Sequence, residues 1–209
     1  MAGMNMLIKR FSVAASAAVC ALMFTGCLEV HTEIRFDSSD SGSVRSEYQL
    51  PVELARFTEI DPPTITALQP LEKSYILDYL YDIPGVELID YQADYGDEFH
   101  RVTTVISFSD WNGLERLLEL HGMAAEHPGD ESGIDLLVFP ADGDPVADSP
   151  FLQDAANGIS ISVEVRSYAP VTSVDGFPGM SYTGRSARFE VPVVDAATAA
   201  DSIWMRVRW

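Results

Sequence analysis

Few residues in this sequence have the type and spacing to do chemistry, and an acidic loop holds three of them. Asp142, Asp144 and Asp148 lie within one stretch that is rich in glycine and proline. Clustered carboxylate oxygens of this kind can hold calcium, but their spacing does not match an EF-hand loop. Because the whole chain is acidic, we expect a solvated acidic turn here, with a metal site as the alternative.

The histidines do not form a catalytic or metal-binding pattern. His121 and His127 are six residues apart, which is not the spacing of a helical pair of metal ligands. His31 falls on the polar face of an expected strand, and we expect all four histidines, His100 included, at the surface. The sequence contains no Gly-x-Ser-x-Gly motif, phosphate-binding loop or dinucleotide fingerprint. We therefore expect no enzymatic activity and no cofactor.

The N-terminal segment leads to a cysteine in a defined chemical context. Two basic residues at 9–10 precede an apolar run of small residues, 11–24, which is followed by Thr25-Gly26-Cys27. A positive start, an apolar run of about 7–15 residues and a small-residue cleavage site define a secretory signal. The run is shorter than the roughly 20 apolar residues that a membrane-spanning helix needs. We expect residues 1–26 to be removed and residues 27–209 to form a single domain.

The end of this segment resembles the lipobox of bacterial lipoproteins. In that motif the cysteine takes a diacylglyceryl group on its sulfur and usually a further acyl chain, such as palmitate, on its new amine. Cys27 matches the modified cysteine, whereas Phe24 replaces the usual aliphatic residue. The resemblance implies a stable membrane anchor, since stable attachment needs more than one acyl chain. In enteric-type bacteria an aspartate after the cysteine retains the protein at the inner membrane, so Leu28 implies the outer membrane, facing the periplasm or the cell surface.

Composition excludes several kinds of partner and reaction. The net charge of −19 becomes −21 when residues 1–26 are removed, because they carry two bases and no acid. Such a charge repels nucleic-acid phosphates and anionic headgroups, so we expect no nucleic-acid partner. The charge should also hold the folded body off an anionic membrane surface, with the lipid as the only firm attachment. Cys20 leaves with the signal, so the mature domain has no disulfide and no thiol chemistry.

Alternation of polar and apolar residues predicts strands along most of the mature chain. Residues 28–50 predict an antiparallel hairpin, and further strands are expected at 86–95, 100–108, 159–165, 186–193 and 203–209. One helix is expected to start near Pro70 and to end at Pro84-Gly85. A second, capped by Ser109 or Asp110, is expected to stop at Gly122. This order predicts an α+β fold, a mostly antiparallel sheet with two helices packed on one face.

Residues 122–150 interrupt this pattern. They predict a long, partly ordered excursion with at most one short strand, at 134–139. Loops of this length are uncommon in compact domains and often carry function.

The first hairpin resembles the start of the LppM-like bacterial lipoproteins. The matching residues are Leu28-Glu-Val-His-Thr-Glu-Ile-Arg-Phe-Asp37 and Gly42-Ser-Val-Arg-Ser-Glu-Tyr-Gln-Leu-Pro51, with a looser likeness at 184–194. The resemblance implies an envelope-anchored domain that binds lipid. Members commonly carry a C-terminal membrane helix, which this sequence does not show, and no functional residue is transferred from the family.

Trp204 is the aromatic residue that fits the expected core least well. It falls on the strand face opposite Ile203 and Met205, so it is either covered by a helix or exposed as a contact for a ligand or partner. We expect a lipid-anchored, non-enzymatic envelope protein whose domain binds a lipid, another hydrophobic ligand or a protein partner. The alternatives are an envelope hydrolase that uses carboxylates, with or without a metal, and a structural surface protein with no pocket.

Overall fold

The computed structural model describes residues 28–52, 72–120, 122–129, 131–139, 159–192, 195, 199 and 201–209. Within these ranges the chain forms two helices and eleven strands. Their bounds are β1 (Leu28–Phe36), β2 (Gly42–Pro51), α3 (Lys73–Leu80), β3 (Val86–Tyr95), β4 (Phe99–Phe108), α4 (Trp111–Leu120), β5 (Ala124–Glu126), β6 (Gly133–Phe139), β7 (Ile159–Arg166), β8 (Ser173–Gly176), β9 (Ser181–Thr183), β10 (Ser186–Pro192) and β11 (Ile203–Arg208).

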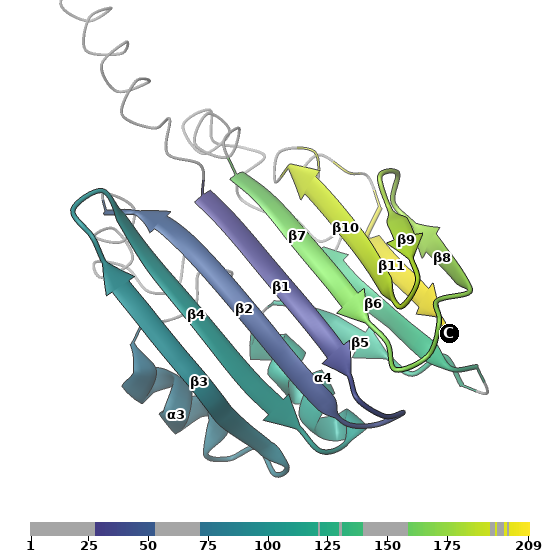
Figure 1. Cartoon of the computed structure of the whole chain (residues 1–209), viewed down its shortest axis with the longest axis horizontal. Helices are drawn as coiled ribbons and strands as arrows, with labels where there is room; N and C mark the ends of the chain where they lie inside the picture. The colour runs from purple at the N-terminus through teal and green to yellow at the C-terminus, as the bar shows by residue number, and fades with distance from the viewer. Residues whose placement is uncertain are drawn as a thin grey trace, which may run out of the picture.

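The described strands form two sheets in two layers (Figure 1). The larger sheet has the order β3-β4-β2-β1-β7-β10-β9, and the smaller has the order β5-β6-β11-β8. All these neighbours pair antiparallel except β1 and β7, which are parallel. The helices and the smaller sheet lie behind the same face of the larger sheet. Buried apolar residues from both sheets and both helices belong to one cluster, so the two layers share a single core.

The expected first hairpin is confirmed. Glu29 pairs with Gln49 and Phe36 with Gly42 in antiparallel register. Alternation in β1 buries Ile34 and Phe36 in the core and turns the residues between them to the outer face of the sheet. Gly42 is required at the turn because a Cβ there would collide with the carbonyl oxygen of Arg35.

The expected limits of α4 are also confirmed. Asp110 caps the helix, because its Oδ1 accepts a hydrogen bond of 2.8 Å from the backbone N–H of Gly113. Gly122 ends the helix with a φ of +67°, a conformation that a glycine adopts without steric strain. The next residue, Met123, donates its N–H to the Leu118 carbonyl at 3.0 Å, which satisfies one of the last helical carbonyls. The helix α3 begins at Lys73, with Glu72 as its N-cap, and ends at Leu80, earlier than the expected stop at Pro84-Gly85. Pro70 itself lies outside the described residues.

The α+β prediction holds only in part. The sheets are mostly antiparallel and two helices are present, as expected, but the second layer is partly a sheet rather than helices alone. The described part of the predicted excursion, up to 139, contains two strands, β5 and β6, where at most one was expected. The strand that the sequence misses is β5, which has three residues and pairs with β6, Ala125 opposite Leu136. So short a strand is too brief to show an alternating pattern. Residues 140–158 lie outside the described residues.

No helix among the described residues has the length and apolar character needed to cross a bilayer.

The shared core predicts that two neighbouring leucines of β6 differ sharply in their effect on stability. Leu136 is fully buried, whereas Leu137 on the opposite face is only half-buried. Leu136→Ala should lower the free energy of unfolding by about 2–5 kcal/mol, as large-to-small core substitutions do, and Leu137→Ala by clearly less. Urea unfolding of the domain without its leader measures both. Equal effects would show that the smaller sheet does not share the core.

Candidate functional site

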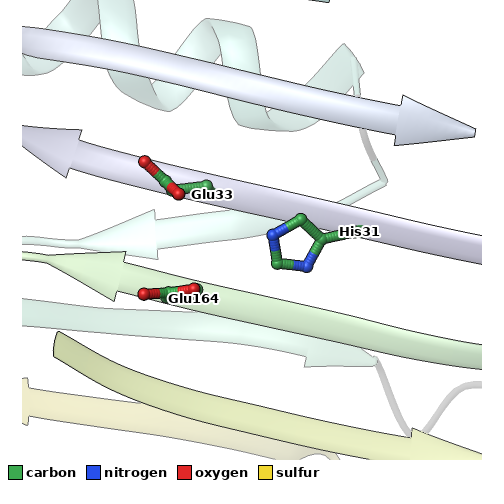
Figure 2. Close-up of side chains that lie close together, drawn as sticks. All are labelled: His31, Glu33 and Glu164. Carbon is green, nitrogen blue, oxygen red and sulfur yellow. The ribbon is translucent and has the colours of Figure 1, made fainter. Parts of the chain in front are cut away.

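One group of polar side chains lies on the outer face of the larger sheet. The parallel register of β1 and β7 places His31 beside Ser162 and Glu33 beside Glu164. Figure 2 shows His31, Glu33 and Glu164 on these neighbouring strands, and one ligand atom from each lies within 4.8 Å of the others. All three are half-buried. An imidazole and two carboxylates are a donor set that zinc accepts.

A guanidinium already supplies the positive charge at this cluster. The Arg166 Nη2 lies 3.3 Å from Oε2 of Glu33, and its Nε donates to Oε1 of Glu164 at 2.8 Å. The hydroxyl of Ser186 donates to the same Oε1 at 2.6 Å. The His31 Nδ1 lies 3.2 Å from the Ser162 hydroxyl oxygen. The group is therefore a hydrogen-bonded ion-pair network that joins β1, β7 and β10, and a metal ion would have to displace Arg166.

The protonation behaviour of Glu164 fits this structural role. Burial alone would raise the pKa of Glu164, but hydrogen bonds from Arg166 and Ser186 outweigh it and leave the pKa below its usual value. The hydrogen bond to Glu164 in turn raises the pKa of the Arg166 guanidinium. A carboxyl that acts as a general acid near neutral pH needs a raised pKa. Glu164 is shifted in the opposite direction and stays ionised.

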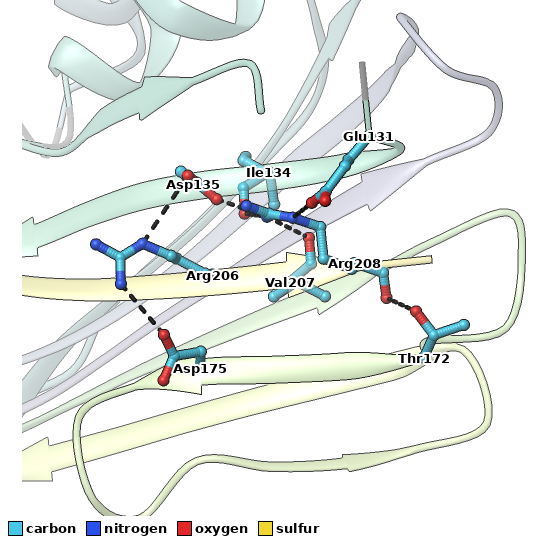
Figure 3. Close-up of polar contacts among 8 residues, drawn as sticks. All are labelled: Glu131, Ile134, Asp135, Thr172, Asp175, Arg206, Val207 and Arg208. Atoms are coloured by element: carbon cyan, nitrogen blue, oxygen red, sulfur yellow. Dashed lines mark hydrogen bonds and ion pairs between the residues drawn. The ribbon is translucent and has the colours of Figure 1, made fainter. Parts of the chain in front are cut away.

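A second ion-pair network lies on the smaller sheet (Figure 3). Arg206 reaches Asp175 of β8 with Nη1 at 3.3 Å and Asp135 of β6 with Nε at 3.9 Å. Arg208 donates from Nε to Glu131 at 2.7 Å and pairs through Nη1 with Asp135 at 2.5 Å. The two arginines of β11 thus link three adjacent strands, and their charges are balanced by the acids around them.

Trp204 lies next to this network and lines an open hollow of about 480 Å³. Its indole is half-buried, and the guanidinium carbon of Arg206 lies 5.9 Å from the ring centroid, within cation–π range. Phe177, Pro178 and Ala199 supply apolar surface around it, and Asp201 and Ser202 supply polar surface. Neither described helix lines this hollow. Of the two alternatives expected for Trp204, cover by a helix and an open contact, the described residues favour the open contact.

The remaining candidates from the sequence lie outside the described residues. These are Cys27 and the acidic residues Asp142, Asp144 and Asp148. Lipidation of Cys27 and the solvated acidic turn therefore stay predictions. Among the histidines expected at the surface, His127 is exposed, His31 and His100 are half-buried, and His121 lies outside the described residues.

The cluster around His31 could not be assembled from the sequence. His31 and Ser162 are 131 residues apart and meet only through the parallel pairing of β1 with β7. The polar faces of both strands are visible in the sequence, but their register is not.

Comparison with known proteins supports the architecture and little more. No protein-family model matches the chain, and no curated protein matches it. The described part of the chain is a two-layer, sheet-rich domain with two helices. A solved structure of this class that the chain resembles is the folded domain of the LppM protein of Mycobacterium tuberculosis, determined by NMR. The TM-score is 0.51, the sequence identity is 11%, and the match covers 88% of this chain and 90% of that chain. At this identity the likeness shows the fold alone.

The Arg166 network predicts a measurable change in the acid titration of Glu164. Arg166→Gln removes the positive charge and the hydrogen bond that hold the pKa of Glu164 low, so this pKa should rise. A carboxyl whose pKa is lower in the folded state than in the unfolded state stabilises the folded state at pH values above its unfolded-state pKa. This stabilisation is lost as the pH falls through the folded-state pKa. The variant should therefore lose less stability on acidification than the wild type.

NMR titration of the Glu164 carboxyl measures the pKa directly, and urea unfolding at several pH values measures the stability. Arg45→Gln is the matched control, because Arg45 pairs with Glu47 on β2 and is not among the groups that shift Glu164. An unchanged pKa of Glu164 in Arg166→Gln would contradict the assignment.

Proposed function

We propose that this chain is a lipid-anchored lipoprotein of the cell envelope whose domain binds a hydrophobic ligand or a protein partner without catalysis. The anchor is proposed at Cys27 because an apolar leader and the small pair Thr25-Gly26 precede it. Leu28 in the next position supports placement at the outer membrane. The fold likeness to the LppM domain is consistent with this class of protein.

The observation that carries the binding role is the hollow beside Trp204. Its volume of about 480 Å³ falls within the roughly 300–1,000 Å³ of small-molecule sites. Indole and phenyl rings from Trp204 and Phe177 offer large apolar area together with one indole N–H. Because Asp175 and Asp135 already balance the charge of Arg206, the site does not select an anion. An apolar molecule, or an apolar side chain of a partner, fits this chemistry best.

The proposal that the domain is not an enzyme rests on the charged clusters. Both carboxylates of the His31 cluster contact Arg166, and the lowered pKa of Glu164 does not suit a general acid. The hydrolase alternative requires Asp142, Asp144 and Asp148 to converge with a histidine, and these three aspartates lie outside the described residues. The net charge of −19 supports the proposal that nucleic acid is not a partner.

The binding role predicts that removal of the Trp204 indole weakens the uptake of an apolar ligand. The neutral fluorescent probe N-phenyl-1-naphthylamine would be titrated into the domain without its leader, and native mass spectrometry would detect any co-purified hydrophobic molecule. Trp204→Ala should weaken probe binding about tenfold, roughly 1.4 kcal/mol. It should also abolish co-purification.

Tyr81→Ala is the matched control, because Tyr81 is 88% exposed and lies just beyond α3, away from the hollow. Equal probe binding by Trp204→Ala and wild type, or a wild-type domain that takes up no apolar molecule, would reject the binding role.

A further inference from the structure

The proposed anchor would hold one end of the larger sheet close to the membrane. β1 begins at Leu28, the residue that follows Cys27. Leu28 pairs with Ile159 of β7, and Glu29 pairs with Gln49 of β2, so the start of β1 is held from both sides. Consecutive Cα atoms are about 3.8 Å apart. An acylated Cys27 would therefore keep this end of the larger sheet directly at the headgroup layer.

The strand register shows which other residues share this end of the sheet. Leu50 at the end of β2 pairs with His100 of β4, and His100 pairs with Tyr95 at the end of β3. The β3–β4 hairpin, the end of β2 and the start of β1 accordingly lie side by side in Figure 1. The turn between β1 and β2 lies at the opposite end. A nine-residue strand at about 3.3 Å per residue separates the two ends by roughly 30 Å.

The β3–β4 hairpin offers aromatic surface in a fixed conformation. Tyr95 is 55% exposed, and its ring stands edge-on to His100 with centroids 5.1 Å apart. The Gly96 N–H donates to the Phe99 carbonyl at 3.1 Å, and the Val52 N–H donates to the carbonyl of residue 98 at 3.1 Å. These bonds fasten the tip of the hairpin to the end of β2. The Tyr95 hydroxyl lies 3.3 Å from the Tyr91 hydroxyl, and its exposed ring suits the interface between lipid and water.

We propose that the tip of the β3–β4 hairpin, Tyr95 to Phe99, sits in the interfacial layer of the bilayer and sets the orientation of the domain. The inference rests on the proposed lipid anchor. The anchor holds the tip at a high effective concentration near the lipid, so modest aromatic contacts suffice for docking. Asp97 and Glu98 in the turn keep it out of the hydrocarbon core and favour zwitterionic over anionic lipid. The β1–β2 turn, which contains Asp40, then faces away from the membrane.

Cysteine labelling tests this orientation on the full lipidated chain. After removal of residues 1–26 the sequence retains Cys27 alone, and its acylated sulfur does not react with a maleimide. Asp97→Cys would carry a nitrobenzoxadiazole label at the hairpin tip, and Asp40→Cys would carry it at the far turn. The protein would be reconstituted in phosphatidylcholine vesicles that contain lipid with a nitroxide near the headgroup. The label at 97 should lose most of its emission, and the label at 40 should keep nearly all of it.

A tyrosine substitution tests the aromatic contact itself. Tyr95→Ser in the Asp97→Cys background should reduce the quenching at 97. Tyr182→Ser is the control, because this tyrosine of β9 is exposed to a similar degree but lies on the other edge strand of the sheet. It should leave the quenching unchanged. Quenching that Tyr95→Ser does not alter would overturn the role of the tyrosine.

Two further readouts separate failure of the orientation from failure of the anchor. Radiolabelled palmitate on the chain and flotation with vesicles report the anchor. If palmitate is absent and the protein does not float, the proposed anchor fails and the orientation fails with it. If both readouts are positive but labels at 97 and 40 are quenched equally, the anchor stands and the orientation is overturned.

Discussion

The apolar inner face of the seven-stranded sheet is the constraint on which the rest of the molecule depends. Burial of apolar surface is the main favourable term in folding, so the strands that carry apolar side chains on this face must be covered, whereas the edge strand β9 stays exposed. Two helices, each about 10–12 Å wide, cover roughly four or five strands spaced about 4.8 Å apart. The smaller sheet covers the remainder, and its residues Ile134, Leu136 and Met205 are fully buried. The need for a second sheet follows from the width of the first.

Because the inner faces of both sheets form the core, the charged side chains and the proposed binding site lie on the outer faces. On the larger sheet Arg166 ties two glutamates together across β1 and β7. On the smaller sheet Arg206 and Arg208 of β11 pair with aspartates of the two neighbouring strands, β6 and β8. Trp204 is the large aromatic residue that breaks this polar pattern, and the hollow forms beside it. The two ion-pair networks and the hollow thus arise because alternate residues of each strand point to opposite faces of its sheet.

Local patterns predicted the parts of this architecture that depend on neighbouring residues. The first hairpin, the Asp110 cap of α4, its stop at Gly122 and the outward face of Trp204 all follow from spacing within a short stretch. Pairings between distant strands were missed, and with them the smaller sheet and the cluster around His31. The parallel contact of β1 with β7 and the pairing of β6 with β11 depend on tertiary packing, which a single sequence does not encode as a local pattern.

Both sheets and both helices contribute to one core, so they should unfold as one cooperative unit. Native-state hydrogen exchange tests it most directly, because separate cores open with separate free energies. The amides of Leu136 and Met205 in the smaller sheet should exchange with the same free energy of opening as those of Ile34 and Val165 in the larger sheet. A clearly lower free energy for the smaller sheet, with the larger sheet still protected, would contradict it.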